Sequence, residues 1–448
     1  MLINKFIFSN KNFLHFLILS IPLSIMLGNL VTNINIILIC LFGLAKYRLR
    51  TFKLDQKVYQ YLIYGFFGYV ITITLVSYLP ALYDKTLYID LYKYDALKEN
   101  MIKSFLYLRY LILFLVVDKL IQEKVLKIKL FFISCAFFSS ILAIDVLVQV
   151  STGTDLLGFS IVNNRPSGFF GSELVAGGYI QKFSLFFVFG LAFLFNLQKK
   201  KIYILLSLSM FFFFFSILLT NNRMSLIIFL ASIFLFFLME KKIRKFFFVL
   251  LSVSSITIFL ALKIFTVSFS EKLEYRGPIM SFIYTTKQLV QTGPELFYYD
   301  KLDEPVQFKN GYLLVFNTAI QQWKKKKIFG HGMKSTIINC EYNTPFRVCT
   351  SHPHNYILEI LVDVGIIGFL LIYSLFFLVT LNFIKFYKTS ADIKLKFIAV
   401  PFFLIVFFEF FPLRSSGSFF TTNNSVLIFL MLAFLMNISK LYPEDKKL

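Results

Sequence analysis

Apolar residues in this chain gather into long blocks separated by short polar stretches, and this spacing is the first guide to its fold. The blocks run to about 20 residues each, the length that a helix needs to cross a hydrocarbon layer about 30 Å thick. Alternating segments of about 10 residues, which are typical of membrane β-barrels, do not occur in the sequence. The pattern therefore predicts an all-α polytopic membrane protein with twelve spans, at 13–29, 31–45, 58–80, 104–118, 130–150, 176–197, 202–220, 224–239, 246–266, 354–380, 397–412 and 425–440.

Positive charges are concentrated in five of the polar stretches between the predicted spans. With twelve spans, all five clusters fall on the same side of the membrane as both termini, and the positive-inside rule identifies that side as the cytoplasm. The long loop 267–353, between spans nine and ten, then lies outside, and we expect it to be folded with short amphipathic helices. The chain is expected to form a single transmembrane domain, 1–448, and the basic clusters lie at 46–57, 119–129, 199–201, 241–245 and 385–396.

The chain has 448 residues, of which 58% are hydrophobic and 16% are charged, and its formal net charge is +22. A charge this positive could indicate a nucleic-acid partner. Most lysines and arginines, however, lie between spans, where orientation in the membrane accounts for them. Membrane lipids are therefore expected partners and nucleic acid is not. Lys5 and Lys11 precede the first apolar block without a small-residue cleavage site, which indicates an uncleaved first helix rather than a signal peptide.

The four cysteines divide between the spans and the long loop. Cys40 and Cys135 lie in spans, where they are simplest to explain as small apolar side chains. Cys340 and Cys349 lie in the loop, on the predicted oxidising side of the membrane. We therefore expect a disulfide between them rather than two free thiols, and closing so short a ring would stabilise the fold by about 2–3 kcal/mol.

The most informative polar segment is Ser-His-Pro-His-Asn-Tyr-Ile-Leu-Glu at 351–359, at the start of the tenth predicted span. Pro353 suits the first turn of a helix, which would place His354 at the N-terminal end of that span. Free N–H groups and the helix dipole at that end favour a neutral imidazole, which can accept a proton from a substrate. His354, with His352 beside it, is therefore the candidate catalytic base.

Three polar residues follow His354 along one face of the predicted helix. Asn355, Glu359 and Asp363 are spaced four residues apart, so we assign them a supporting role around the base. Two other interpretations of the histidines remain open. They could simply cap a helix at the level of the lipid headgroups. They could also bind a metal, but the chain has four histidines and lacks the usual ligand spacing, so neither a metal nor a cofactor is expected.

Three arginines lie at or near the predicted outer surface. Arg165 and Arg223 lie in or beside turns, and Arg109 lies in the outer third of the fourth span. A guanidinium group matches two phosphate oxygens at once, so all three are candidates for binding a diphosphate. Anchoring to lipid headgroups is the alternative for each of them.

Several of these segments carry a family resemblance when they are taken together. They are Thr-Asn-Asn-Arg at 220–223, Ser-Gly-Phe-Phe-Gly-Ser-Glu at 167–173, Ile-Phe-Gly-His-Gly at 328–332, His-Pro-His-Asn at 352–355, Leu-Glu at 358–359 and Gly-Ile-Ile-Gly at 365–368. This set resembles the signature of the O-antigen ligase and polymerase superfamily, bacterial membrane glycosyltransferases that use undecaprenyl-diphosphate-linked glycans. The resemblance covers roughly residues 160–375 and is most specific at 352–368.

The resemblance implies a metal-independent, inverting glycosyl transfer at the periplasmic face of a bacterial inner membrane. His354 would deprotonate the acceptor hydroxyl, and Arg223 would hold the departing undecaprenyl diphosphate, with Arg165 as a second candidate for that role. Members of the family often carry a further arginine in the large loop, where this chain has Lys309. Either Lys309 or Arg276 takes its place, or this contact is missing from the chain.

Glu173, within the segment 167–173, is a further supporting residue by the same resemblance. The acceptor would be lipid A-core for a ligase, the growing glycan for a polymerase, or a protein for a third group, and the shared motifs do not distinguish them. The alternative from another class is a polysaccharide-lipid flippase or other transporter. A transporter would place its ionisable groups at the membrane midplane, whereas here they gather at the outer ends of the spans.

Overall fold

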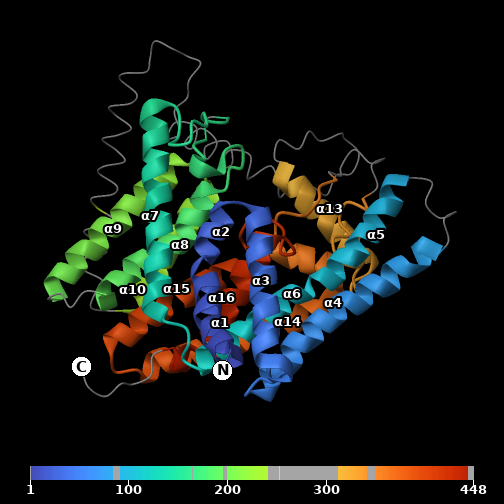
Figure 1. Cartoon of the computed structure of the whole chain (residues 1–448). Helices are drawn as coiled ribbons and strands as arrows, with labels where there is room; N and C mark the ends of the chain where they lie inside the picture. Colours follow the sequence, from blue (N-terminus) through green and yellow to red (C-terminus); the bar gives the residue numbers. More distant parts are fainter. Residues whose placement is uncertain are drawn as a thin grey trace, which may run out of the picture.

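The computed structural model describes residues 2–83, 91–163, 165–194, 199–240, 252, 311–340 and 349–441. Within these ranges the chain forms helices and turns with two isolated β-bridges, so the predicted all-α class is confirmed for the described residues (Figure 1). The α-helices are α1 Leu2–Leu19, α2 Ile21–Met26, α3 Asn29–Tyr47, α4 Lys57–Tyr83, α5 Leu91–Leu106, α6 Leu108–Gln122, α7 Ile128–Thr152, α8 Ala176–Leu194, α9 Lys199–Leu219, α10 Arg223–Met239, α13 Gly311–Lys325, α14 Tyr356–Thr389, α15 Ile393–Glu409 and α16 Thr422–Met436. Short 3-10 helices are η1 Arg48–Phe52, η3 Gly168–Phe170 and η6 Ile438–Lys440.

Four helical segments are long and apolar enough to cross a membrane by length and composition: Asn29–Phe52, Lys57–Pro80, Ile128–Thr152 and Tyr356–Thr389. Shorter apolar helices occur at Ile204–Leu219, Arg223–Met239 and Thr422–Met436. Each predicted span overlaps a helix of the structure except 246–266, of which only residue 252 is among the described residues. The number of twelve crossings and the position of the large loop stay predictions.

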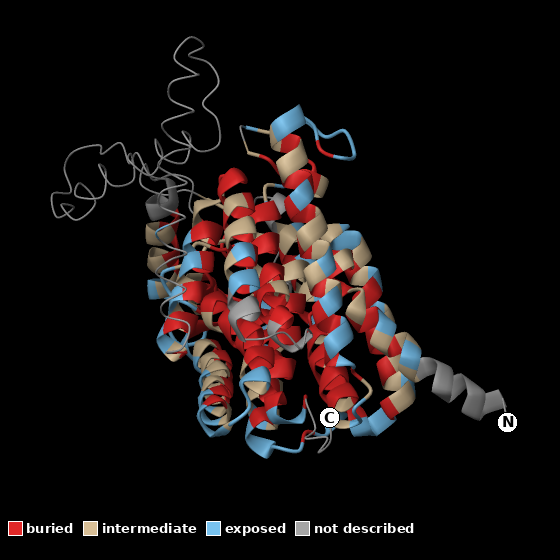
Figure 2. Cartoon of the chain, turned by 90° about the vertical axis from the view of Figure 1, so that its left-hand side faces the viewer, coloured by how far each residue is buried: buried red, intermediate tan, exposed pale blue. Residues whose placement is uncertain are grey.

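Helix α16 is apolar on every side and lies at the centre of the bundle. Each of its residues from Ser425 to Met436 is buried, and most of α15 is buried beside it. A helix that is hydrophobic all round is stable only when other helices cover it. Figure 2 shows buried residues through the middle of the bundle and more exposed residues on its outer helices.

Large apolar side chains are exposed on the outer helices. Leu30 is 73% exposed, Val76 is 62% exposed and Phe377 is 59% exposed. A water-soluble protein rarely exposes so much apolar surface, whereas contact with lipid tails costs these side chains nothing. The exposed surface therefore agrees with a membrane protein.

The lower end of the bundle in Figure 1 carries ion pairs between distant parts of the chain. Glu123 lies within 3.4 Å of Lys11 and 3.3 Å of Lys46, and Asp55 lies 2.5 Å from Lys440. We call this the basic end. It brings together α1, the 46–57 stretch, the end of α6 and η6, which the predicted topology had assigned to one side of the membrane.

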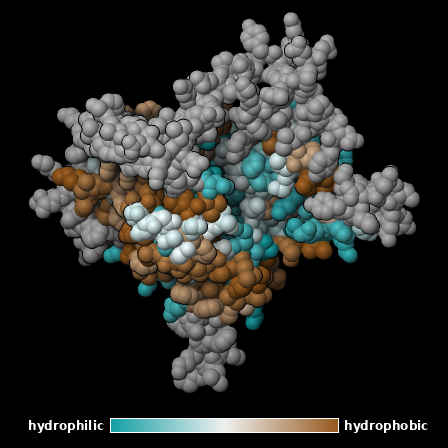
Figure 3. All heavy atoms as spheres, turned by 90° about the horizontal axis from the view of Figure 1, so that it is seen from above, coloured by the Kyte–Doolittle hydropathy of each residue, from teal (hydrophilic) through white to brown (hydrophobic). Residues whose placement is uncertain are grey.

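The opposite end, which we call the histidine end, carries the loop 155–171, the turn 220–222 and the segment 350–355. Seen from above in Figure 3, hydrophilic side chains gather near the middle and on one side of this end, next to broad hydrophobic surface. Helix α13, part of the predicted large loop, also lies here (Figure 1). Its buried residues Val315, Thr318, Ala319 and Gln322 follow amphipathic spacing, so one of the short amphipathic helices expected in this loop is present.

Candidate functional site

The segment that carries His352 and His354 lies just before α14. The helix begins at Tyr356, and Asn355 is its N-cap, because Asn355 Oδ1 accepts a hydrogen bond from the Leu358 N–H at 3.1 Å. The prediction that Pro353 lies in the first helical turn is therefore wrong. His354 also lies outside the helix, with a φ of 53°, in the left-handed region that non-glycine residues rarely adopt.

The turn between α15 and α16 holds the backbone of His354 in this conformation. The Ser416 N–H donates to the His354 carbonyl at 2.8 Å. Asn355 Nδ2 donates to the carbonyls of Pro412, at 2.8 Å, and Arg414, at 3.0 Å. A left-handed non-glycine residue costs of order 1–3 kcal/mol and persists where its surroundings fix it, which is common at functional sites.

The imidazole rings of His352 and His354 contact each other, with centroids 4.2 Å apart and planes at 61°. His352 Nδ1 lies 3.0 Å from Ser351 Oγ, and its buried Nε2 has no hydrogen-bond partner among the described residues. Burial, and then the neighbouring charges of His354 and Lys334, lower the pKa of His352 to about 4. His352 is therefore uncharged near neutral pH and is a weak base.

Glu359 connects α14 to the turn that holds the histidines. Its two carboxylate oxygens accept hydrogen bonds from Ser418 Oγ and from the Phe419 N–H, each at 2.5 Å. The side chain is almost fully buried, at 1% exposure for the residue. Glu359 therefore fixes the turn 410–421 against the helix instead of facing open space.

Asp363 performs the same task for the segment after α13. One carboxylate oxygen accepts from the Lys334 N–H at 2.7 Å, and the other accepts from the N–H and hydroxyl of Ser335, at 3.0 and 2.7 Å. Lys334 is itself held in a left-handed conformation, with a φ of 58°, and Asn100 Nδ2 of α5 donates to its carbonyl at 3.1 Å. The predicted supporting residues thus brace two loops around the histidines.

Helix α14 is interrupted at Gly365, where φ is 63° and ψ is −169°. The backbone groups released by this break bond to the segment 327–332. The His331 N–H donates to the Val362 carbonyl at 2.9 Å, and the Ile366 N–H donates to the Lys327 carbonyl at 3.0 Å. This pairing satisfies groups that would otherwise be buried without partners.

Glycines make this close approach of two backbones possible. A Cβ on Gly330 would lie 2.5 Å from the Asp363 carbonyl oxygen, and a Cβ on Gly365 would overlap the Ile328 carbonyl. The Gly-x-Gly at 330–332 and the Gly-x-x-Gly at 365–368, which are far apart in the sequence, therefore form one structural unit. Helix α4 adds to it, because Tyr78 Oη donates to the Met333 carbonyl at 2.8 Å.

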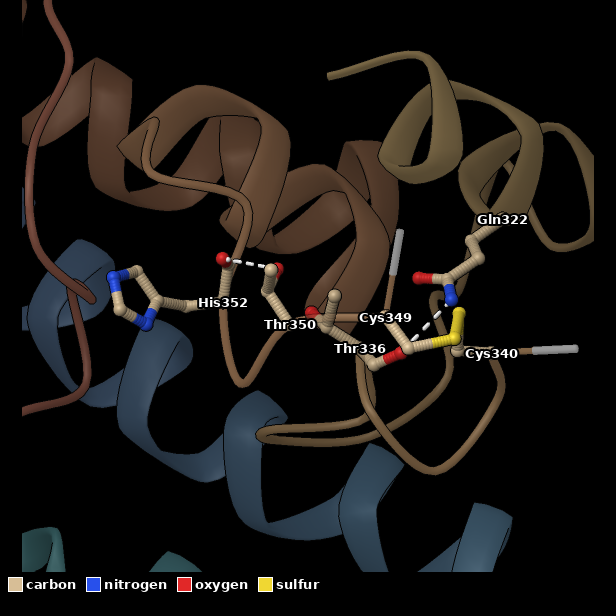
Figure 4. Close-up of a disulfide and its surroundings, with 6 residues drawn as sticks. All are labelled: Gln322, Thr336, Cys340, Cys349, Thr350 and His352. Carbon is tan, nitrogen blue, oxygen red and sulfur yellow. Dashed lines mark hydrogen bonds between the residues drawn. A yellow bond between two sulfur atoms is a disulfide. The ribbon is translucent and has the colours of Figure 1, made fainter. Parts of the chain in front are cut away.

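Cys340 and Cys349 form a disulfide close to the histidines (Figure 4). On one side of it, Gln322 Nε2 of α13 donates to the Thr336 carbonyl at 2.8 Å. On the other side, Thr350 Oγ1 donates to the His352 carbonyl at 2.8 Å. The bridge therefore connects the segment fixed by α13 and Asp363 to the residues that lead into His352.

Arg223 is the first residue of α10 and is half-buried, with Asn222 as N-cap accepting from the Ser225 N–H at 3.2 Å. The turn before it packs against the start of α8, where a Cβ on Gly177 would lie 2.8 Å from Asn222 Cβ. Small residues therefore bring the predicted Thr-x-x-Arg turn close to α8. Arg223 directly follows the turn 220–222 and so lies at the histidine end of the bundle.

Arg165 and Glu173 lie on either side of the segment that leads to α8. Gln149 Oε1 of α7 accepts from the N–H groups of Ser167 and Gly168, both at 2.9 Å, and so fixes this segment. Arg165 is half-buried beside it, and Glu173 is exposed. Both residues therefore lie at the histidine end, on either side of the segment fixed by Gln149.

Arg109 is less closely connected with the histidines. Its Nη2 donates to Tyr110 Oη at 2.8 Å, its guanidinium carbon lies 4.8 Å from the centre of the Tyr110 ring, and its carbonyl accepts from Cys40 Sγ at 3.3 Å. The two contacts with Tyr110 lie within α6, and the contact with Cys40 joins α6 to α3. Two other candidate clamp residues, Lys309 and Arg276, lie outside the described residues.

Lys334 is a cation near the site that the sequence did not single out. It is half-buried, its backbone binds Asp363, and its charge acts on His352. Burial lowers the pKa of Lys334. In the sequence, Lys334 is marked only by its position two residues after Gly332. That position does not predict a role near the histidines, because the role depends on the packing of the 327–335 segment against α14.

Comparison with family models gives one match, to the O-antigen ligase family (Wzy_C), over residues 208–373. The matched range contains the turn before Arg223, the Gly-x-Gly segment, both histidines and the break in α14. A comparison with curated proteins found no match. The family match agrees with the resemblance carried by the sequence motifs: residues 208–373 match the O-antigen ligase domain, which supports the O-antigen ligase and polymerase superfamily.

Proposed function

We propose that this protein is a glycosyltransferase that moves a glycan from undecaprenyl diphosphate to an acceptor at the periplasmic face of a bacterial inner membrane. The family match supports the coarser statement, a membrane protein of O-antigen ligase or polymerase type that acts as a glycosyltransferase-like enzyme. The observation that carries the finer proposal is the pair of contacting imidazoles, with His354 fixed in a left-handed conformation by Ser416.

In this proposal His354 is the general base. It takes the proton from the acceptor hydroxyl as the oxygen forms a bond to the anomeric carbon of the glycan. The bond between that carbon and the diphosphate oxygen breaks, and the diphosphate leaves with the electron pair, so the configuration inverts. A diphosphate leaves without needing a proton, so one base and nearby cations are sufficient for the reaction and no metal is required.

The two histidines have different roles in this scheme. A base binds its proton usefully when its pKa is near the working pH, and the pKa of about 4 makes His352 unsuitable. An uncharged His352 beside His354 instead excludes water from one face of the base and limits its orientations. His354 is therefore the catalytic residue and His352 a positioning residue.

Cations at the histidine end would stabilise the leaving group. Arg223 and Arg165 are assigned to the diphosphate, because their guanidinium groups can donate two parallel hydrogen bonds to phosphate oxygens. Arg109 is the weaker candidate, since its guanidinium group is already engaged with Tyr110. Lys309 or Arg276 is proposed for the remaining contact.

The partners that this proposal requires are a lipid-linked glycan donor and an acceptor, which is lipid A-core, the growing glycan or a protein. The proposed topology is multi-pass with both termini cytoplasmic, so that the histidine end meets the donor in the periplasm. Contacts among Lys11, Lys46, Asp55, Glu123 and Lys440 support one common side for the terminal regions and for two of the five predicted basic clusters, 46–57 and 119–129.

The test is glycan transfer by the purified full-length protein in lipid nanodiscs. Wild type, His354→Gln and Arg223→Gln would be supplied with an undecaprenyl-diphosphate glycan and candidate acceptors. His354→Gln should lower the rate by about 10²–10⁴-fold, the usual contribution of a general base, and Arg223→Gln should lower it less. His15→Gln is a matched control, because His15 is a half-buried histidine of α1 near Lys127, away from the site.

Melting temperatures of the same samples would show that the variants are folded. Transfer by His354→Gln at the wild-type rate would remove the base assignment. Movement of the intact lipid-linked glycan across the membrane, with no new glycosidic bond and no dependence on His354, would replace the enzyme by a flippase.

A further inference from the structure

Three charged residues, Lys182, Glu409 and Arg414, form a buried cluster that has no part in the proton transfer described above. Lys182 belongs to α8, Glu409 is the last residue of α15 and Arg414 lies in the turn 410–421. Lys182 Nζ lies 2.9 Å from Glu409 Oε1, and Arg414 Nη1 lies 2.8 Å from the same oxygen. Arg414 Nη1 also donates to the Phe408 carbonyl at 3.1 Å.

The cluster holds two positive charges and one negative charge away from water. The side chains of Lys182, Glu409 and Arg414 are 13%, 2% and 10% exposed. No second carboxylate lies within salt-bridge distance of either cation in the part of the chain that the structure describes. One positive charge is thus in excess.

Arg414 also keeps a free donor. Its Nε is buried and has no hydrogen-bond partner within the described residues, and Lys182 uses one of its three donors on Glu409. Glu409 Oε2 is likewise buried without a hydrogen-bond partner there, so Glu409 engages the two cations through Oε1 alone. An uncompensated buried charge and an unsatisfied buried donor are both costly. An anion that arrived at the cluster would remove both costs at once.

The cluster is connected through the fold both to the segment that carries His354 and to the turn that precedes Arg223. On one side, the Arg414 carbonyl accepts from Asn355 Nδ2, and Ser416 in the same turn holds the His354 carbonyl. On the other side, the first turn of α8, the helix that carries Lys182, packs against the turn before Arg223, through the contact of Gly177 with Asn222. A group bound at the cluster would therefore lie near the base and the arginine clamp.

We propose that Lys182 and Arg414 bind a phosphoryl group of the lipid-linked donor and that Glu409 holds the two cations in place. This assignment rests on the proposed function, since it names the donor diphosphate as the anion. It adds two cations to the clamp. Both lie on the side of the histidine segment formed by α8, α15 and the turn 410–421, whereas Lys334 lies on the side formed by α4, α5 and α13.

Binding of undecaprenyl diphosphate would be measured with the full chain in phosphatidylcholine nanodiscs, for wild type and Lys182→Met. Removing Lys182 should raise the Kd by about tenfold or more, the loss expected for one charge-assisted hydrogen bond. Lys182→Arg should keep most of the affinity. Lys119→Met is the matched control, because Lys119 is equally buried, at 12% exposure, and pairs with the buried Asp118 at the basic end.

Glu409→Gln gives a second and independent measurement. It leaves the cluster with two positive charges, so the lipid diphosphate should raise the melting temperature of this variant by more than it raises that of wild type. A purely structural ion-pair cluster predicts the opposite, a destabilised protein with no added response to the lipid. This comparison also holds if Lys182→Met fails to fold.

The outcomes separate this assignment from the proposed function. An unchanged Kd in Lys182→Met, in a protein whose wild type transfers glycan, would overturn the assignment and leave the enzyme in place. If undecaprenyl diphosphate does not bind to the wild-type protein, both the assignment and the proposed function are overturned. Equal competition by phosphatidylglycerol would show that the cluster takes a membrane headgroup, which also contradicts the assignment to the donor.

Discussion

At the basic end of the bundle, acidic side chains pair with lysines, whereas at the histidine end the carboxylates of Glu359 and Asp363 accept hydrogen bonds from loops. Asp55 and Lys440 have side chains that are 57% and 43% exposed. Glu359 and Asp363 are 1% and 0% exposed. The Asp55–Lys440 contact is worth little in stability because both side chains are exposed and water competes for both charges. The hydrogen bonds to Glu359 and Asp363 are costly to break because the donors would remain buried.

This difference separates two uses of charge in one membrane protein. Charges at the basic end orient helices and need only lie on the correct side. Carboxylates at the histidine end fix the positions of two loops, and through them the histidines and Lys334. Substitutions at the two ends should therefore differ strongly in effect even when they remove the same chemical group.

The largest difference is expected between Asp363→Ala and Asp55→Ala. Asp363→Ala leaves three donors without an acceptor, from the backbone of Lys334 and from the backbone and hydroxyl of Ser335. The expected loss in the free energy of unfolding is roughly 3 kcal/mol or more, since each unpaired donor costs about 1–3 kcal/mol. Asp55→Ala should cost less than about 1 kcal/mol.

Thermal unfolding of both variants in nanodiscs would measure this contrast. Asp363→Asn keeps one acceptor and should fall between the two. Equal melting temperatures for Asp363→Ala and Asp55→Ala would mean that the carboxylate does not hold the loop.

A smaller effect, about 2–3 kcal/mol, is expected from removing the disulfide, by the loop-entropy estimate for a short ring. Cys340→Ser with Cys349→Ser should lower the melting temperature and also the transfer rate, because the bridge connects the α13 side of the site to the residues before His352. A reducing agent should reproduce both changes in wild type and alter nothing further in the double variant. Cys40→Ser with Cys135→Ser, which removes the two free buried cysteines, would control for a reducing agent that acts elsewhere.

The sequence predicted the parts of this architecture that follow from local composition. Apolar blocks gave the helices, and the loop position of Cys340 and Cys349 gave their pairing. The stretch around His352 and His354 stood out because ionisable groups are rare beside an apolar span. These features need no knowledge of which segments meet in space.

The sequence could not predict the features that depend on contacts between distant segments. The apolar run of α14 predicts an unbroken helix, and the break at Gly365 makes sense only with the backbone of 327–332 lying against it. Gly330 and Gly332 alone indicate a turn. Lys182 and Glu409 are ionisable residues within the predicted spans 176–197 and 397–412, but only the fold brings them to the same site as Arg414.

The smallest expected effect is a difference in how His352, at the histidine end, and Asp55, at the basic end, make stability depend on pH. Burial, with His354 and Lys334, lowers the pKa of His352 from 6.5 to about 4, so between these values the unfolded chain binds more protons at this residue than the folded chain does. Stability therefore falls as the pH is lowered from 6.5 toward 4. The hydrogen bond to Lys440 lowers the pKa of Asp55 below its usual 3.8, so the contribution of Asp55 is lost only at still lower pH.

Melting curves should show His352→Gln losing less stability than wild type between pH 6.5 and 4, and Asp55→Asn following wild type there. Parallel curves for His352→Gln and wild type over that range would mean that His352 is protonated as easily in the folded protein as in the unfolded chain. That result would contradict the role of His352 as an uncharged positioning residue beside His354.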